Sequence, residues 1–200
     1  LAHLAGGDRE RGLAELERIT EQAGSGLQAD FSLTTAQLRD RQFDKALASI
    51  ARLESKQPQN AMAANLRASA LLGKGDAAGA RKALEEALKR DPKFLPATAN
   101  LAALDLRDKK PEAAKKRFSD LLQLDAKNIA AMLALADLTE RTASREDRKK
   151  AADEALALLK KARETDKASV PANLALAAWY VRQDRAKEAI PQLQEALNAN

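Results

Sequence analysis

The chain has 200 residues, of which 34 are basic and 29 acidic, so its formal net charge at pH 7 is +5. It contains no cysteine and one histidine, His3, which excludes disulfide frameworks, cysteine nucleophiles and cysteine-based zinc sites. Hydrophobic residues make up 45% of the chain and aromatic residues only 3%. Alanine and leucine dominate the apolar share, which favours closely packed helices over β-sheets.

The elements expected in chain order are pairs of short helices. Residues 1–26 predict the end of one helix and a second helix at about 9–22, a partial unit. Units with two helices each follow, and their expected boundaries are 27–60, 61–94, 95–128, 129–169 and 170–200. In the unit 61–94 the turn is Gly73-Lys74-Gly75-Asp76, where glycine permits a tight turn and Asp76 suits the N-cap of the next helix.

These units repeat with a fixed period. The position that ends the second helix recurs at Pro58, Pro92 and Ala126, 34 residues apart, and then at Lys167, 41 residues further on. A triplet of small and large apolar residues on one face of the second helix follows the same register. Its members are Gly12/Leu16/Ile19, Ala46/Ile50/Leu53, Ala80/Leu84/Ala87, Ala114/Phe118/Leu121, Ala155/Leu159/Ala162 and Ala189/Leu193/Ala196. A helix pair repeated with this period predicts a stacked array in which neighbouring units bury a shared core.

A 34-residue helix–turn–helix period resembles the tetratricopeptide repeat. The resemblance implies an all-α fold, a right-handed α-α superhelix (solenoid) of stacked repeats, over a single array from 1 to 200. Three runs are similar in wording to the tetratricopeptide-repeat lipoprotein of the bacterial PEP-CTERM/exosortase system: LTTAQLRDRQFDKALASIARLESKQP, NLRASALLGKGDAAGARKALEEAL and FLPATANLAALDLRDKKPEAAKKRF.

Three features depart from a plain repeat. The unit 129–169 carries seven additional residues around 142–150, which either lengthen a helix or form a loop, and which act either as a docking element on the outer rim or as a tolerated insertion. Trp179 and Tyr180, at the end of a first helix, are either core residues or a stacking pair for a ligand. Arg67 occupies a position that the family fills with a large apolar residue, so either that helix is rotated or Leu66 packs instead.

A candidate binding surface follows from the repeat geometry that the resemblance implies, since first helices of this family line a concave groove. The last position of the first helix reads Arg39, Gly73, Arg107, Arg141 and Arg182. Arginine binds carboxylates through two parallel hydrogen bonds, so these arginines predict a basic ladder for acidic or C-terminal peptides. The alternative is that each arginine only complements the negative end of its helix.

Asn65 and Asn100 are further candidates on this surface, where they would bond a peptide backbone, and Asp137 supplies an opposing charge. The full residue set with which chaperone-binding tetratricopeptide proteins hold a terminal carboxylate is absent. Whether the groove or the convex face binds is left open.

The sequence contains no combination of residues typical of catalysis, cofactor binding or metal binding. Carboxylates alternate with Lys and Arg at helical spacing, and the glycine motifs are turns rather than phosphate loops. A one-sided basic stripe with interleaved aromatics is also missing, so nucleic acid is not an expected partner. No apolar run is long enough to cross a membrane, and no signal peptide or initiating Met is visible.

We therefore expect a non-enzymatic scaffold that binds proteins or peptides. The narrower resemblance implies a periplasmic location, lipid anchoring through a cysteine N-terminal to this sequence, and a role in protein sorting and exopolysaccharide production. The alternative is a cytoplasmic regulatory or substrate-positioning array attached to an enzyme such as a glycosyltransferase. The chain begins part-way through a repeat, and we expect it to be a fragment of a longer array.

Overall fold

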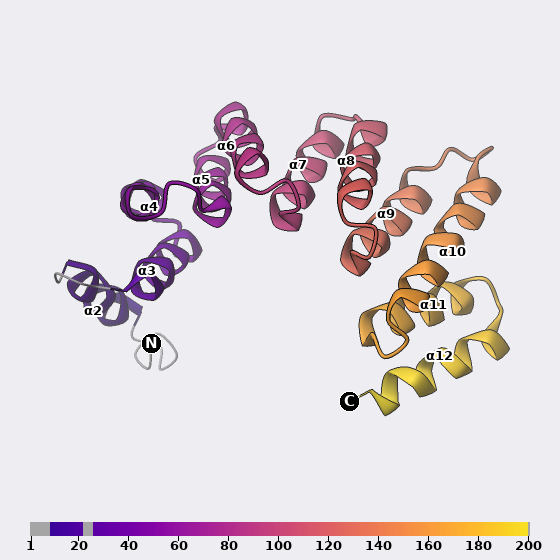
Figure 1. The fold of residues 1–200 in the computed structure, drawn as a ribbon. Helices are drawn as coiled ribbons and strands as arrows, with labels where there is room; N and C mark the ends of the chain where they lie inside the picture. The colour runs from indigo at the N-terminus through magenta and orange to yellow at the C-terminus, as the bar shows by residue number, and fades with distance from the viewer. Residues whose placement is uncertain (1–8, 22–25, 200) are drawn as a thin grey trace. The chain divides into compact units, whose positions relative to one another are not determined.

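The computed structural model describes residues 9–21 and 26–199 (Figure 1). His3 lies outside these ranges. The described residues form α-helices without any strand, as the sequence predicts. The helices are α2 (Arg9–Glu21), α3 (Leu27–Arg39), α4 (Phe43–Lys56), α5 (Ala61–Gly73), α6 (Ala77–Arg90), α7 (Leu95–Arg107), α8 (Pro111–Leu124), α9 (Ile129–Thr142), α10 (Arg148–Thr165), α11 (Val170–Arg182) and α12 (Ala186–Asn198).

The chain divides into two compact units, residues 1–101 and 102–200, with the boundary inside α7. In the first unit α3 packs on α4 and α5 on α6, and α4 also contacts α5. In the second unit α9 packs on α10 and α11 on α12, and α10 also contacts α11. First helices of successive pairs touch as well, α3 with α5 and α9 with α11. Each unit is therefore a stack of helix pairs, which is the architecture of an α-solenoid.

The turns inside four of the pairs share one backbone conformation. Each has three residues, and the middle residue has a positive φ: 59° at Arg41, 85° at Gly75, 57° at Lys109 and 54° at Asp184. The N–H of the third residue then donates to the carbonyl five residues earlier, as from Asp76 to Leu71 at 2.9 Å. Only Gly75 adopts the left-handed conformation without steric cost.

This conformation makes a prediction for Lys109. Replacing Lys109 by glycine should raise the free energy of unfolding by about 0.5–1 kcal/mol, because the left-handed conformation strains a residue with a Cβ. Urea denaturation followed by circular dichroism measures the change. Gly75→Ala is the converse control and should destabilise by a similar amount; a loss of stability in Lys109→Gly would contradict the argument.

The turns between pairs are equally regular. The turns after α4, α6, α8 and α10 each have four residues, and the fourth N–H donates to the first carbonyl at 3.1 Å. The fourth residue then caps the next helix in three of these turns. The side chains of Asn60, Asn128 and Ser169 accept hydrogen bonds from backbone N–H groups in the first turns of α5, α9 and α11. These caps satisfy donors that a helix start leaves without partners.

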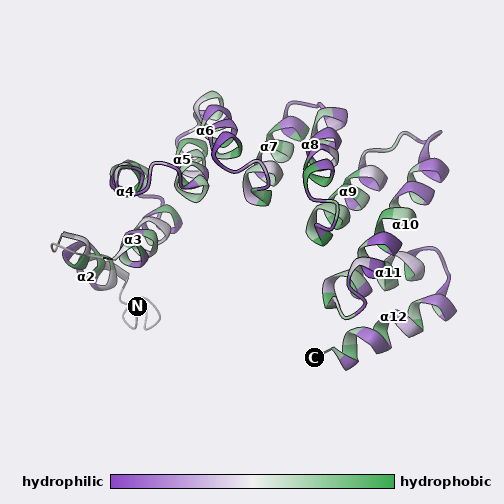
Figure 2. Cartoon of the chain, in the orientation of Figure 1, coloured by the Kyte–Doolittle hydropathy of each residue, from purple (hydrophilic) through white to green (hydrophobic). Residues whose placement is uncertain are grey.

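The core contains most of the predicted triplets of small and large apolar residues of the second helices. Ala80, Leu84 and Ala87 are fully buried. Figure 2 shows the complementary pattern, with hydrophilic residues concentrated in the connecting turns of each unit. The last triplet differs: Ala189 and Ala196 are buried but Leu193 is 41% exposed, beside exposed Ile190 and Leu197.

The insertion both lengthens a helix and forms a longer turn. α10 has 18 residues, whereas α6 and α8 have 14 each. Ala80 is the fourth residue of α6, but its equivalent Ala155 is the eighth residue of α10. α10 therefore begins about one helical turn earlier than the other second helices. The turn before it, residues 143–147, has five residues instead of three.

Candidate functional site

The predicted arginines are all exposed at the ends of first helices, Arg39 in the first unit and Arg107, Arg141 and Arg182 in the second. Three of them form ion pairs of their own, the longest between Arg107 Nε and Asp108 Oδ1 at 3.9 Å. Arg141 Nη1 lies 3.0 Å from Asp137 Oδ2 on the same helix, and Arg182 Nη2 lies 2.9 Å from Glu140 Oε2 on α9. The predicted opposing charge, Asp137, is thus a partner of Arg141.

The two candidate asparagines bond to each other. The Asn100 amide nitrogen donates to Asn65 Oδ1 over 2.9 Å, and Asn65 is only 8% exposed. Both belong to the first compact unit. In this arrangement Asn65 links α5 to the middle of α7, and the side chain of Asn100 has a second N–H and its oxygen for other partners.

Gly73 interrupts the arginine series for a steric reason. A Cβ built on Gly73 would lie 2.2 Å from Cε1 of Phe43, so the aromatic ring occupies the space that a side chain needs. Phe43 begins α4 and Gly73 ends α5. Arginine is therefore excluded at this position by a contact between neighbouring repeats.

This contact predicts that the effect of Gly73→Ala on stability changes sign when the Phe43 ring is removed. Gly73→Ala should destabilise the native protein by about 1 kcal/mol, because overpacking outweighs the better helix propensity of alanine. In a Phe43→Ala background the same substitution should stabilise, since the obstructing ring is gone. Denaturation of the four proteins of this double-mutant cycle gives the coupling. Additive effects would show that the ring does not exclude a side chain.

The first helices of the second unit expose a face of small and apolar residues beside the arginines. On α11 the exposed positions include Leu174, Ala178 and Val181, with Leu174 47% and Val181 56% exposed. On the neighbouring α9, Ala130 and Asp137 are exposed. The face therefore combines apolar area with guanidinium groups at one end of each helix.

Arg67 belongs to a charged network in the first unit. It pairs with Glu54 of α4 at 3.0 Å and with Glu86 of α6. Arg90 pairs with the same two carboxylates, at 3.1 Å to Glu54 and 2.7 Å to Glu86. Leu66 packs against the core cluster of Ala46, Ile50 and Ala70. Of the two alternatives for this helix, packing by Leu66 is thus confirmed.

The only Trp and Tyr are core residues. Trp179 is 4% and Tyr180 6% exposed, and their rings meet edge to face with centroids 5.6 Å apart. The indole nitrogen donates to Glu140 Oε1 at 2.9 Å. The guanidinium of Arg185 lies over both rings, 5.8 Å from the centroid of Trp179 and 4.8 Å from that of Tyr180. Such contacts between cations and rings are attractive.

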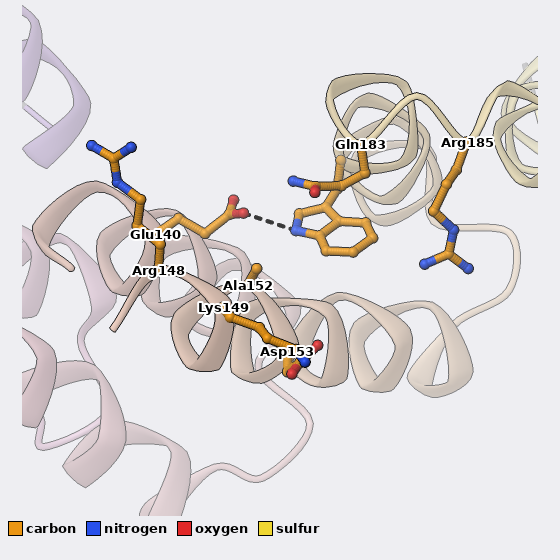
Figure 3. A pocket seen from close by; sticks show the side chains of 8 residues that line it. Glu140, Arg148, Lys149, Ala152, Asp153, Gln183 and Arg185 are labelled. Carbon is orange, nitrogen blue, oxygen red and sulfur yellow. Dashed lines mark hydrogen bonds between the residues drawn. The ribbon is translucent and has the colours of Figure 1, made fainter. Parts of the chain in front are cut away.

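A cavity of about 610 Å³ lies beside this aromatic pair in the second unit. Figure 3 shows Arg148, Lys149 and Asp153 on the α10 side, and Gln183 and Arg185 on the opposite side. Glu140 of α9 directs its carboxylate across the cavity toward the indole (Figure 3). The sequence analysis included Arg148 and Lys149 only as part of the insertion around 142–150, and it did not single out Glu140, Asp153, Gln183 or Arg185.

The described part of the chain has neither a metal-binding cluster nor a membrane-spanning helix. It contains no group of three or more His, Cys, Asp or Glu residues placed to hold a metal ion. None of its helices is long and apolar enough to span a membrane. The chemistry of the surface is therefore that of exposed arginines, carboxylates and small apolar side chains.

Comparison with known proteins identifies the repeat. A family model described as tetratricopeptide repeat matches residues 71–138. This part of the chain is similar to tetratricopeptide repeats. No curated protein matches the chain in sequence. Tetratricopeptide repeats are typical of interaction scaffolds, so this similarity supports a protein-interaction scaffold.

Several solved structures share the fold. MamA from Desulfovibrio magneticus RS-1 is 17% identical, with a TM-score of 0.53 over 89% of this chain and 97% of that one. A tetratricopeptide repeat protein from Parabacteroides merdae is 18% identical, with a TM-score of 0.58 over 100% and 76% of the two chains. A human IFIT1 dimer with PPP-AAAA is 19% identical, with a TM-score of 0.60 over 95% of this chain but 45% of that chain. At these identities the likeness concerns the tetratricopeptide fold alone.

The cavity was missed because its residues come from two successive repeats. Glu140 and Trp179 are 39 residues apart in the sequence. The repeat pattern predicts that both lie near the ends of first helices, but it does not predict the hydrogen bond between them. One sequence feature could have indicated the cavity. The unit with the insertion directly precedes the unit that contains Trp and Tyr, so the inserted residues and the aromatic pair belong to neighbouring units.

Proposed function

We propose that this chain is a non-enzymatic scaffold that binds acidic or C-terminal peptide segments on the first-helix face of its second unit. The observation that carries the proposal is the exposed arginine at the end of α7, α9 and α11, next to the exposed apolar residues of α11. A peptide carboxylate would pair with a guanidinium, and apolar side chains of the peptide would cover Leu174 and Val181.

The ion pairs of these arginines do not block such binding. The Arg141–Asp137 pair is exposed on both sides, at 67% and 61%, and pairs of this kind contribute roughly 0–1 kcal/mol. An incoming carboxylate can therefore displace Asp137. Electrostatic attraction of this kind sets selectivity and association rate more than affinity.

A peptide array with acidic and C-terminal segments tests the proposal against the native chain, Arg107→Ala/Arg141→Ala, and a control with the same charge change, Lys160→Ala/Lys161→Ala on α10. We expect salt-sensitive binding that the first double variant loses and the control keeps. Asp137→Asn should strengthen binding, since it removes the competing carboxylate. Equal binding by both double variants would overturn the role of the arginines and leave them as helix-end charges.

We also propose that the chain works in the bacterial envelope, in a periplasmic lipid-anchored protein of exosortase-linked sorting and exopolysaccharide production. The support is the similarity of the three sequence runs given above. Labelling of the full-length protein with a radioactive fatty acid tests the anchor, and substitution of the modified cysteine should abolish the label. A catalytic domain in the full-length protein, without lipid labelling, would favour the enzyme-attached array instead.

A further inference from the structure

The geometry points to a second binding site, distinct from the first-helix face: we propose that the cavity between α9, α10, α11 and the turn before α12 binds an acidic peptide segment. The lengthened α10 forms one wall of this cavity. Its proposed ligand is a short peptide with neighbouring carboxylates, held by Arg148 and Lys149.

The cavity depends on the insertion. Arg148 and Lys149 lie in the first turn of α10, which precedes the point where the other second helices begin. Ala152 and Asp153 continue the wall into the next turn. On the other side the cavity is lined by Trp179, Gln183 and Arg185. The additional turn of α10 and the aromatic pair, each present once in the chain, thus meet at one place.

The free charge in the cavity is positive. Among the described residues Arg148 and Lys149 make no ion pair, and both are exposed. The two carboxylates of the wall differ. Glu140 already accepts from the Trp179 indole and from Arg182, each at 2.9 Å, so its charge is compensated. Asp153 remains as one negative charge against two unpaired cations.

The opposite wall is held in place. Arg185 pairs with Glu188 at 2.9 Å while it lies over Trp179 and Tyr180, and this fixes its guanidinium. The Glu188 carboxylate lies beside this guanidinium, so its pKa is below the ordinary value because of the hydrogen bond from Arg185. The side chain of Gln183 is exposed in the same wall and carries both a donor and an acceptor. The Gln183 amide can therefore hydrogen-bond to the backbone of the peptide, while Arg148 and Lys149 on the opposite wall pair with its carboxylates.

The same features disfavour nucleic acid. The uncompensated carboxylate of Asp153 in the wall would repel a continuous row of phosphates. The aromatic rings are buried in the core, so they offer no open face on which bases could stack. A peptide whose carboxylates reach Arg148 and Lys149 meets neither obstacle. The first-helix arginines Arg107 and Arg141 do not line the cavity, so the two sites can be tested separately.

The test uses a five-residue Gly-Asp-Glu-Asp-Gly peptide, blocked at both ends, and its amide analogue with Asn and Gln. Trp179 is the only tryptophan and lines the cavity, so its fluorescence reports binding directly. The native chain should respond to the acidic peptide at up to about 1 mM, more strongly at low salt, and not to the amide analogue. No response at any concentration in this range would overturn the proposal.

Two variants locate the site. Arg148→Glu/Lys149→Glu should weaken the acidic peptide by about tenfold or more. Lys160→Glu/Lys161→Glu changes the net charge equally on the same helix, at exposed positions outside the cavity, and should keep the affinity within about twofold. Equal losses in both variants would show a general charge effect and overturn the site.

A deletion separates the inserted turn from its charges. Removing residues 144–150 joins Ala143 to Ala151 and restores the repeat register, in which Thr142, Ala143 and Ala151 take the three turn positions that Asp108, Lys109 and Lys110 occupy between α7 and α8. This variant should keep its helical circular dichroism and lose the tryptophan response. A short oligonucleotide that binds more tightly than the peptide, or undiminished peptide binding to Arg148→Glu/Lys149→Glu, would overturn the assignment. Loss of binding only in Arg107→Ala/Arg141→Ala would assign the peptide to the first-helix face and overturn this site.

Discussion

Replacing Trp179 by alanine should lower the free energy of unfolding by about 3–5 kcal/mol, the largest single effect expected in this chain. The indole is 4% exposed and packs in the core cluster that includes Leu159, Leu176 and Tyr180. The substitution removes this packing, the edge-to-face contact with Tyr180 and the hydrogen bond to Glu140. It also leaves Arg185 with one aromatic ring instead of two.

Urea denaturation followed by circular dichroism measures this loss without relying on the tryptophan signal. Trp179→Phe is the matched control, because phenylalanine keeps an aromatic ring but lacks the indole N–H. Trp179→Phe should lower the free energy of unfolding by only about 1–2 kcal/mol. The Glu140 carboxylate loses the indole N–H but keeps its ion pair with Arg182, so it is not left without a partner. A loss below about 1 kcal/mol for Trp179→Ala would mean that the aromatic pair does not support the second unit.

The helices were predictable because the same sequence pattern recurs in every unit. Each second helix carries a small–large triplet on one face, and turns with Pro, Asn or Asp at fixed positions separate the pairs. One deviation inside a single repeat cannot shift a register that the other repeats define. The insertion illustrates the limit, because the number of residues did not decide between a longer helix and a longer turn, and the structure has both.

The candidate site was less accessible to sequence. Whether an arginine such as Arg182 is free depends on a carboxylate 42 residues away, and the series at the ends of first helices does not reveal such pairs. The exception at Gly73 shows the same limit, since the reason is the ring of Phe43 in the preceding repeat. Residue type at a repeat position predicts exposure, but contacts between repeats decide which charges remain available.

Replacing Glu54 by glutamine should lower the free energy of unfolding by about 2–3 kcal/mol. Glu54 is 18% exposed and accepts from Arg67 and Arg90, which are 28% and 12% exposed. Glutamine keeps the volume but loses the charge that both guanidinium groups need. Urea denaturation measures the loss. Glu85→Gln on α6 is the control: its side chain is exposed, so the expected change lies within about 0.5 kcal/mol.

The network also predicts acid sensitivity. Partial burial raises the pKa of Glu86, but the hydrogen bond from Arg90 and the charges of Arg67 and Arg90 together outweigh it, so the net pKa lies below the ordinary value of 4.5. A lowered pKa stabilises the native state fully above pH 4.5, and this stabilisation is lost as the pH falls through the native-state value.

Native protein and Glu86→Gln should therefore differ by up to about 1 kcal/mol at pH 7, because Glu86 is 45% exposed and solvent screens its pairs. This difference in stability should shrink as the pH is lowered below 4.5. Protonation then neutralises the Glu86 carboxylate, so that the native side chain is uncharged like glutamine. Denaturation midpoints across this range measure the effect. A difference that stays constant with pH would show that the two arginines do not hold Glu86 in its charged form. The helices α4, α5 and α6 would then be joined mainly by their apolar contacts.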